Sequence, residues 1–125
     1  MTSKANFIAL GAALAAIGVA LGAFGAHSLK AVLAAPELAI WETATRYWLF
    51  GSLGVLAFGL FRQSRPEARA YPGALLGVGT LLFGLSLYAL ALGAPRWLGA
   101  VTPFGGAGLI AGFIAFACAA RQRHG

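Results

Sequence analysis

The sequence predicts an all-α, polytopic membrane protein, a four-helix transmembrane bundle with short loops. Hydrophobic residues make up 60% of the chain and charged residues only 10%, whereas a soluble domain carries about a quarter charged residues. The charges are also excluded from long segments. Four stretches contain no Asp, Glu, Lys or Arg: Ala5–Leu29, Tyr47–Phe61, Ala70–Pro95 and Trp97–Ala120.

These stretches have the length of membrane spans. An α-helix needs about 20 predominantly apolar residues to cross about 30 Å of hydrocarbon. Three of the stretches are long enough alone, and the second is long enough if its helix begins a turn or more earlier. We therefore expect one transmembrane domain over residues 1–125, with helices at about 6–26, 36–61, 72–92 and 102–120.

The first helix follows Lys4, and this arrangement resembles a secretory signal peptide. The apolar run is longer than the hydrophobic part of a typical signal peptide. We expect this segment to be retained as the first span.

The second helix is expected to start at Pro36-Glu37, because proline has no N–H to leave unpaired and a carboxylate is favourable at a helix N-terminus. Its first turns carry Trp41, Tyr47 and Trp48. Aromatic residues of this kind gather at membrane interfaces, so we expect them to act as interfacial anchors.

Prolines also delimit the last two helices. Pro66 prevents a continuous helix through the polar link Arg62–Tyr71, and Pro72 opens the third helix. Thr102 is a plausible N-cap for the fourth helix and Pro103 a first-turn residue.

The basic residues predict the orientation. Cytoplasmic loops of membrane proteins carry an excess of Lys and Arg. One side would carry Lys4, Arg62, Arg65, Arg69, Arg121 and Arg123, and the other Lys30, Arg46 and Arg96. We expect a multi-pass protein of the cell inner membrane with both termini in the cytoplasm.

Glycines recur along the expected helices, and small residues allow helix backbones to approach closely in lipid. We expect them to pack helices within the bundle, with dimerisation through a glycine face or a backbone-lined cavity as alternatives. The candidate packing positions are Gly18, Gly22, Gly25, Gly105, Gly106, Gly108 and Gly112.

His27 is the most informative polar residue, because ionisable groups in or near a membrane often mark functional sites. Its expected partners are Glu42, Thr43 and Tyr47 at the same end of the second helix. A hydrogen bond that joins the first two helices is the preferred interpretation, and proton handling or ligand binding is the alternative.

Glu42 and Arg46 have the i, i+4 spacing of a helix ion pair, which indicates structural pairing rather than catalysis. No carboxylate lies in the middle of a span, which argues against a proton-coupled exporter. His27 and His124 would lie on opposite sides of the membrane, and Cys118 is the only cysteine, so no metal site is expected. We expect no enzyme activity, no cofactor and no nucleic-acid partner.

Four segments together carry a resemblance to a known family. They are Gly22–Leu29 (GAFGAHSL), Glu42–Tyr47 (ETATRY), Phe83–Leu92 (FGLSLYALAL) and Val101–Gly112 (VTPFGGAGLIAG). In this order and spacing the chain resembles domain-of-unknown-function family 423, small four-helix bacterial membrane proteins with transmembrane protein 256 as an animal relative. The resemblance implies a four-span membrane protein without an established activity.

The family's motif residues fall on Gly22, Gly25, His27, Thr43, Tyr47, Tyr88, Thr102, Pro103, Gly105 and Gly106. Many members carry a histidine where this chain has Gly51. The resemblance therefore does not support a pair of cooperating membrane histidines here. Tyr88 and Thr102 would lie at the same membrane face as His27 and Tyr47, where they either form a shallow polar pocket or satisfy helix-end backbone groups.

The sequence thus favours a non-enzymatic structural or accessory membrane protein that associates through its Gly/Ala-rich helix faces. Besides the lipid bilayer, its expected partners are copies of itself or a larger membrane complex. The alternative is a small transporter or channel-like protein that binds a small solute or lipid near His27, Tyr47 and Tyr88.

Overall fold

A computed structural model describes residues 6–122, and every regular element in that range is helical. Lys4, Arg123 and His124, which entered the sequence predictions, lie outside the described residues. The elements are α1 (Phe7–His27), η1 (Leu29–Ala31), α2 (Ala35–Ser64), α3 (Tyr71–Ala91), η2 (Arg96–Ala100) and α4 (Thr102–Arg121).

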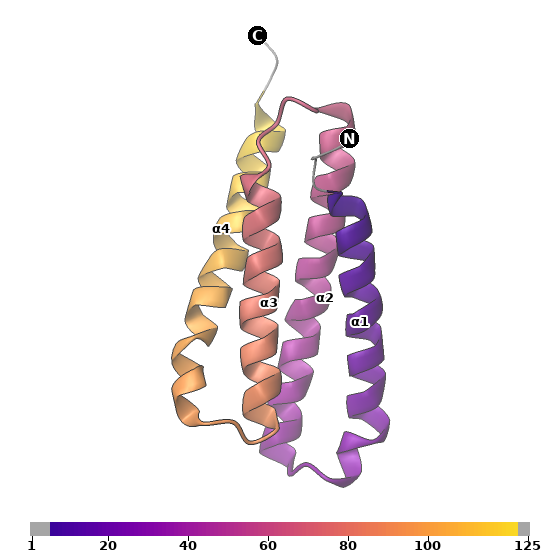
Figure 1. Ribbon diagram of the computed structural model, residues 1–125, viewed down its shortest axis with the longest axis vertical. Coiled ribbons are helices and arrows are strands. Elements are labelled where there is room, and N and C mark those ends of the chain that lie inside the picture. Colours follow the sequence, from indigo (N-terminus) through magenta and orange to yellow (C-terminus); the bar gives the residue numbers. More distant parts are fainter. Residues whose placement is uncertain (1–5, 123–125) are drawn as a thin grey trace.

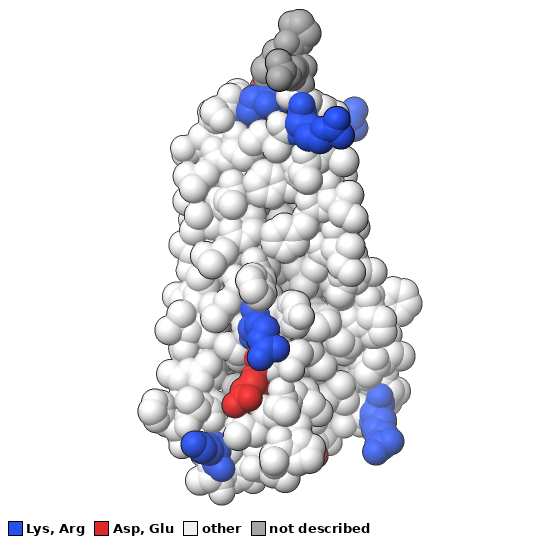
Figure 2. Space-filling model, turned by 180° about the vertical axis from the view of Figure 1, so that it is seen from behind, with Lys and Arg blue, Asp and Glu red and all other residues white. Residues whose placement is uncertain are grey.

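The predicted fold class is confirmed. In the described part of the chain four helical segments are long and apolar enough to cross a membrane. The links between these segments are short, and basic residues gather at one end of the molecule (Figure 2). We call this end, with Arg62, Arg65, Arg69 and Arg121, the basic end. The opposite end, with residues 28–34 and 92–101, is the distal end.

The four long helices lie side by side in chain order (Figure 1). The main contacts join α1 to α2, α2 to α3 and α3 to α4. The two middle helices are therefore the most buried, and α1 and α4 present long apolar faces to the surroundings.

Two helix ends have clear local causes. The second helix continues to Ser64, three residues beyond its expected end, and stops before Pro66. The backbone N–H of Arg65 caps it by donating to the carbonyl of Phe61 at 3.1 Å. The third helix ends before Gly93, whose φ of +100° belongs to the left-handed region that favours glycine.

The interior contains two apolar clusters. Toward the basic end, the buried ring of Phe58 makes edge contacts with Phe7 at 5.4 Å and Phe116 at 5.3 Å between centroids. Toward the distal end, the second cluster is built around Trp41, Trp48 and Tyr88. The bundle is thus closed by aromatic packing at both levels.

The prediction that Trp41 and Trp48 are interfacial anchors is wrong. They are only 4% and 3% exposed. Their indole N–H groups donate to backbone carbonyls of α1, Trp41 to Leu21 at 2.9 Å and Trp48 to Leu14 at 2.7 Å. Both rings can enter the interior because their single polar group finds a partner there.

Candidate functional site

A part-buried polar contact in the distal half joins α2 to α3. The hydroxyl of Thr45 donates to the Trp41 carbonyl at 3.1 Å, and its oxygen lies 2.7 Å from the hydroxyl of Tyr88. A threonine hydroxyl has one hydrogen to donate, so Tyr88 is the donor to Thr45. The ring of Tyr88 packs against Trp41 at a tilted angle of 59°, with centroids 4.4 Å apart.

Glycines of α1 make room for the two indoles. A Cβ atom at Gly18 would lie 2.7 Å from Cδ1 of Trp48, and one at Gly25 would overlap with the ring of Trp41. Gly22 lies between them, and a Cβ atom there would lie 3.1 Å from the Thr45 methyl group. The first helix therefore lies against α2 along a glycine face whose gaps are filled by aromatic rings.

The candidate packing glycines of α4 face α3. A Cβ atom at Gly105 would collide with the backbone at Phe83, and one at Gly112 would lie 2.8 Å from Leu76. A Cβ atom at Gly108 would lie 3.3 Å from the Cα atom of Gly79, and one at Gly106 would lie 3.5 Å from the Phe83 ring. All the predicted packing glycines thus point to contacts inside the chain.

The predicted polar residues do not form one cluster. Tyr88 bonds to Thr45, whereas Thr102 lies 2.7 Å from the Ser86 hydroxyl. Ser86 donates to the Phe83 carbonyl at 3.0 Å, so Thr102 is the donor in that pair. The N-cap of α4 is Val101 and Thr102 is the first helical residue, so the expectation that Thr102 is the N-cap is wrong.

The remaining candidates lie elsewhere. His27 is exposed at the end of α1, and within residues 6–122 its ring makes no hydrogen bond. Tyr47 is 40% exposed and packs edge-on against Phe83 at 5.3 Å. It points away from the Thr45 side of α2, because residues two apart on a helix face nearly opposite directions. Thr43 is half-buried and has no hydrogen bond among the described residues.

Sequence reasoning missed Thr45 and selected Thr43 instead. Thr45 lies four residues after Trp41 and three before Trp48, and these spacings place all three on one helix face. Ser52 continues the same face. The helical spacing of these residues identifies the inward side of α2, and it could have predicted that Thr45 points into the bundle.

Glu42 and Arg46 face outward from α2 and do not pair. Both are exposed, and within residues 6–122 no ion pair or hydrogen bond engages either side chain. Figure 2 shows an acidic and a basic group on the long apolar face, away from both ends. They border a groove of about 280 Å³ between α1 and α2, which is also lined by Gly22, Gly25, Ala26, Trp41 and Thr45.

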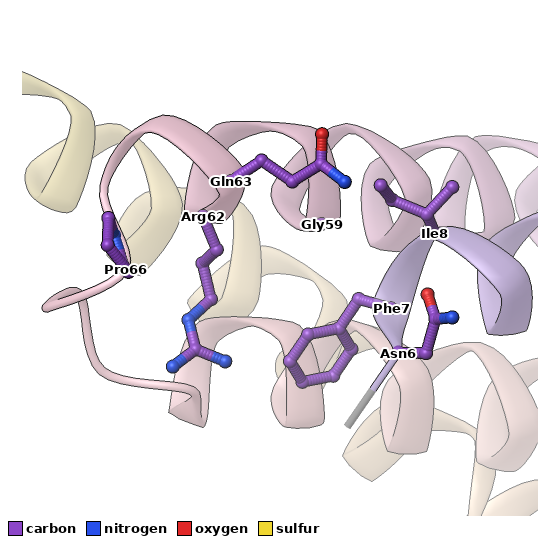
Figure 3. A pocket seen from close by; sticks show the side chains of 7 residues that line it. All are labelled: Asn6, Phe7, Ile8, Gly59, Arg62, Gln63 and Pro66. Carbon is purple, nitrogen blue, oxygen red and sulfur yellow. The ribbon is translucent and has the colours of Figure 1, made fainter. Parts of the chain in front are cut away.

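A second cavity, of about 390 Å³, lies at the basic end between α1 and α2 (Figure 3). Phe7 and Ile8 line it from α1, and Arg62 and Gln63 from α2. Arg62 has a structural role. Its Nε donates to the Ala68 carbonyl at 3.0 Å, which fixes the link between α2 and α3. The cavity therefore lies at a junction between helix ends, where α1 begins and α2 ends.

A third hollow, of about 400 Å³, is almost entirely apolar and opens on the long face of the bundle. Tyr47 and Phe50 of α2 line one side, with Phe83 of α3. The α4 side consists of Gly106, Leu109, Ile110 and Phe113. Its composition suits a hydrocarbon chain rather than a polar solute.

These features define a small helical integral membrane protein with a closely packed interior and outward-facing grooves. The chain belongs to the family described as "Protein of unknown function (DUF423)", which matches residues 21–106. The resemblance seen in the sequence is therefore confirmed.

Relatives in several bacteria match almost the whole chain. A UPF0382 membrane protein of Staphylococcus saprophyticus is 44% identical over 108 residues, which cover 86% of this chain and 90% of the relative. The UPF0382 membrane protein YwdK of Bacillus subtilis is 39% identical over 116 residues, 91% of this chain and 94% of its own.

The UPF0382 inner membrane protein YgdD of Escherichia coli K12 is 40% identical over 115 residues, covering 90% of this chain and 86% of the relative. No solved structure matches the chain.

Proposed function

We propose that this protein is a non-enzymatic structural or accessory component of the cell inner membrane. It would act through lateral contacts with copies of itself or with a larger membrane complex. The supporting observation is the close packing of the interior, which leaves the outer helix faces as the surfaces available for recognition.

The interior polar groups support this proposal. Ser52 and Thr80 are buried, and each hydroxyl donates to a carbonyl four residues earlier in its own helix, at 2.6 Å and 2.7 Å. Within residues 6–122 no buried side-chain polar atom lacks a hydrogen-bond partner. Groups satisfied in this way are not available to a solute.

The association surface would be the alanine-rich outer face of α1. The glycines are used inside the bundle, but Ala12, Ala16 and Ala20 recur every four residues on the exposed side. This spacing allows the close approach of another helix in lipid.

For the orientation, we propose that the basic end faces the cytoplasm. Arg62, Arg65, Arg69 and Arg121 lie at this end, and the distal half carries Lys30, Arg46 and Arg96. The excess follows the positive-inside rule, which would place both termini in the cytoplasm.

The alternative of solute transport near His27, Tyr47 and Tyr88 has weaker support. Tyr88 is 6% exposed and bonded to Thr45, Tyr47 lies on another face of α2, and of the three only Tyr47 lines one of the cavities described above.

The test is affinity purification in lipid nanodiscs followed by mass spectrometry and mass photometry. A defined oligomer or a stoichiometric membrane partner is expected for the wild type. Ala16→Trp should disrupt it, whereas Ala111→Trp on the exposed face of α4 should not. A monomer without a partner, or equal behaviour of both variants, contradicts the proposal.

A further inference from the structure

One outward charge of α2, Arg46, would lie below the hydrocarbon boundary of a membrane that α1 spans. The first helix has 21 residues, a length of about 30 Å, which equals the hydrocarbon thickness. Near its ends Phe7 packs on Phe58 and Gly25 on Trp41, so the hydrocarbon boundary on α2 would fall near Trp41 at the distal end. Arg46 is five residues further in, about 7 Å below that boundary.

Charged residues at such depth normally face the bundle interior or pair with one another. Arg46 does neither, although its spacing from Glu42, which lies at the boundary, would allow an ion pair. A partner outside the chain is therefore needed, with a positive group for Glu42 and a negative group for Arg46.

The polarity of the site identifies that partner. Side chains on a helix lean toward its N-terminus, which for α2 is the distal end. The Arg46 guanidinium therefore reaches up toward the lipid phosphate level, and Glu42, one turn further out, lies just above it. In an aminophospholipid the phosphate is the inner charge and the ammonium the outer one, which is the complementary order.

The surroundings suit the rest of such a lipid. The groove between α1 and α2 is open beside both charges because Gly22 and Gly25 have no side chains. On the other flank of α2 the apolar hollow begins at Tyr47, adjacent to Arg46. It continues toward the membrane centre along Phe50 and Phe113, the direction in which the acyl chains of that leaflet run.

We propose that this surface binds a phosphatidylethanolamine-type lipid of the distal leaflet. Arg46 binds the phosphate with its forked N–H donors, and Glu42 accepts hydrogen bonds from the primary ammonium. One acyl chain fills the hollow lined by Tyr47, Phe50 and Phe113. This proposal does not depend on the proposed association of α1 with other proteins.

Native mass spectrometry of the detergent-purified full chain, titrated with lipids of identical acyl chains, tests it. Phosphatidylethanolamine should bind about tenfold more tightly than phosphatidylcholine, whose quaternary amine donates no hydrogen bond, and than phosphatidylglycerol, which has no amine. Equal affinity of the wild-type protein for the three lipids would overturn the proposal.

Two variants assign the roles. Glu42→Gln should abolish the preference for phosphatidylethanolamine over phosphatidylglycerol, and Arg46→Gln should weaken binding of both lipids about tenfold. Glu37→Gln and Arg96→Gln make the same charge changes outside the groove and should retain wild-type binding. Retained preference in Glu42→Gln, or equal losses in the controls, would contradict the assignment.

A protein partner would be a different occupant. A stoichiometric complex that excludes the lipid and dissociates in Arg46→Gln would show that a protein covers these charges, and it would overturn the lipid proposal.

Discussion

Gly84 of α3 lies against the indole of Trp48 so closely that a methyl group at position 84 would overlap with the ring. On its other side the same indole contacts Gly18 of α1. Trp48 thus fills the space between two helices, and the absence of side chains at both glycines sets their separation from α2.

The first prediction concerns this contact. Gly84→Ala should lower the free energy of unfolding by about 1–3 kcal/mol, because the added methyl group displaces a packed ring. Gly77→Ala is the matched control in the same helix, since a Cβ atom there meets nothing within 4 Å. It should be neutral or stabilising by up to about 1 kcal/mol. Unfolding of purified protein in mixed micelles measures both, and equal effects would count against the packing described.

The second prediction concerns the hydrogen bond between Tyr88 and Thr45. Tyr88→Phe and Thr45→Val each remove one partner, and a double-mutant cycle should give a coupling energy of about 0.6–1.7 kcal/mol. Tyr47→Phe serves as control, because the Tyr47 hydroxyl has no hydrogen-bond partner in the described part of the chain. A coupling energy of zero would mean that the two hydroxyls do not interact.

Third, tryptophan fluorescence should separate the interior from the surface. Trp41 and Trp48 are buried, whereas Trp97 in η2 is 67% exposed. In nanodiscs, acrylamide should quench Trp97 alone, so Trp97→Phe should remove nearly all the quenchable emission. If instead Trp48→Phe removes it, the inward placement of Trp48 is wrong.

Fourth, Thr80 of α3 closes the space beside Gly51 of α2. A Cβ atom at Gly51 would collide with Oγ1 of Thr80. Gly51→His should therefore destabilise the protein, and Thr80→Gly in the same chain should recover part of the loss. Thermal unfolding of the single and double variants is the measurement, and the absence of any recovery would contradict this relationship.

Much of the fold could be predicted from the sequence, because four long runs without charged residues indicate helices that are surrounded by lipid. Helix limits followed from Pro36, Pro66 and Pro103, which constrain the backbone locally. The inward positions of Trp41 and Trp48 could not be predicted from composition. Each ring depends on a carbonyl and a glycine of α1, a contact between distant segments.

The candidate site was less predictable for the same reason. Tyr88 and Thr102 were expected at one membrane face, but their hydrogen-bond partners, Thr45 and Ser86, depend on how three helices are rotated about their axes. Likewise, i, i+4 spacing allows an ion pair between Glu42 and Arg46 but does not require one. The lipid proposal assigns their partners to headgroup charges in the membrane.

The central claim is that the long outer faces of this bundle contact lipid rather than water. Nitroxide labels attached in a Cys118→Ser background at Val19 of α1, Val78 of α3 and Ile114 of α4, all exposed, test it directly. In reconstituted bilayers these labels should be accessible to oxygen and shielded from a water-soluble nickel complex, with the opposite pattern at Arg69. Ready access of the nickel complex to all three apolar positions would contradict the account.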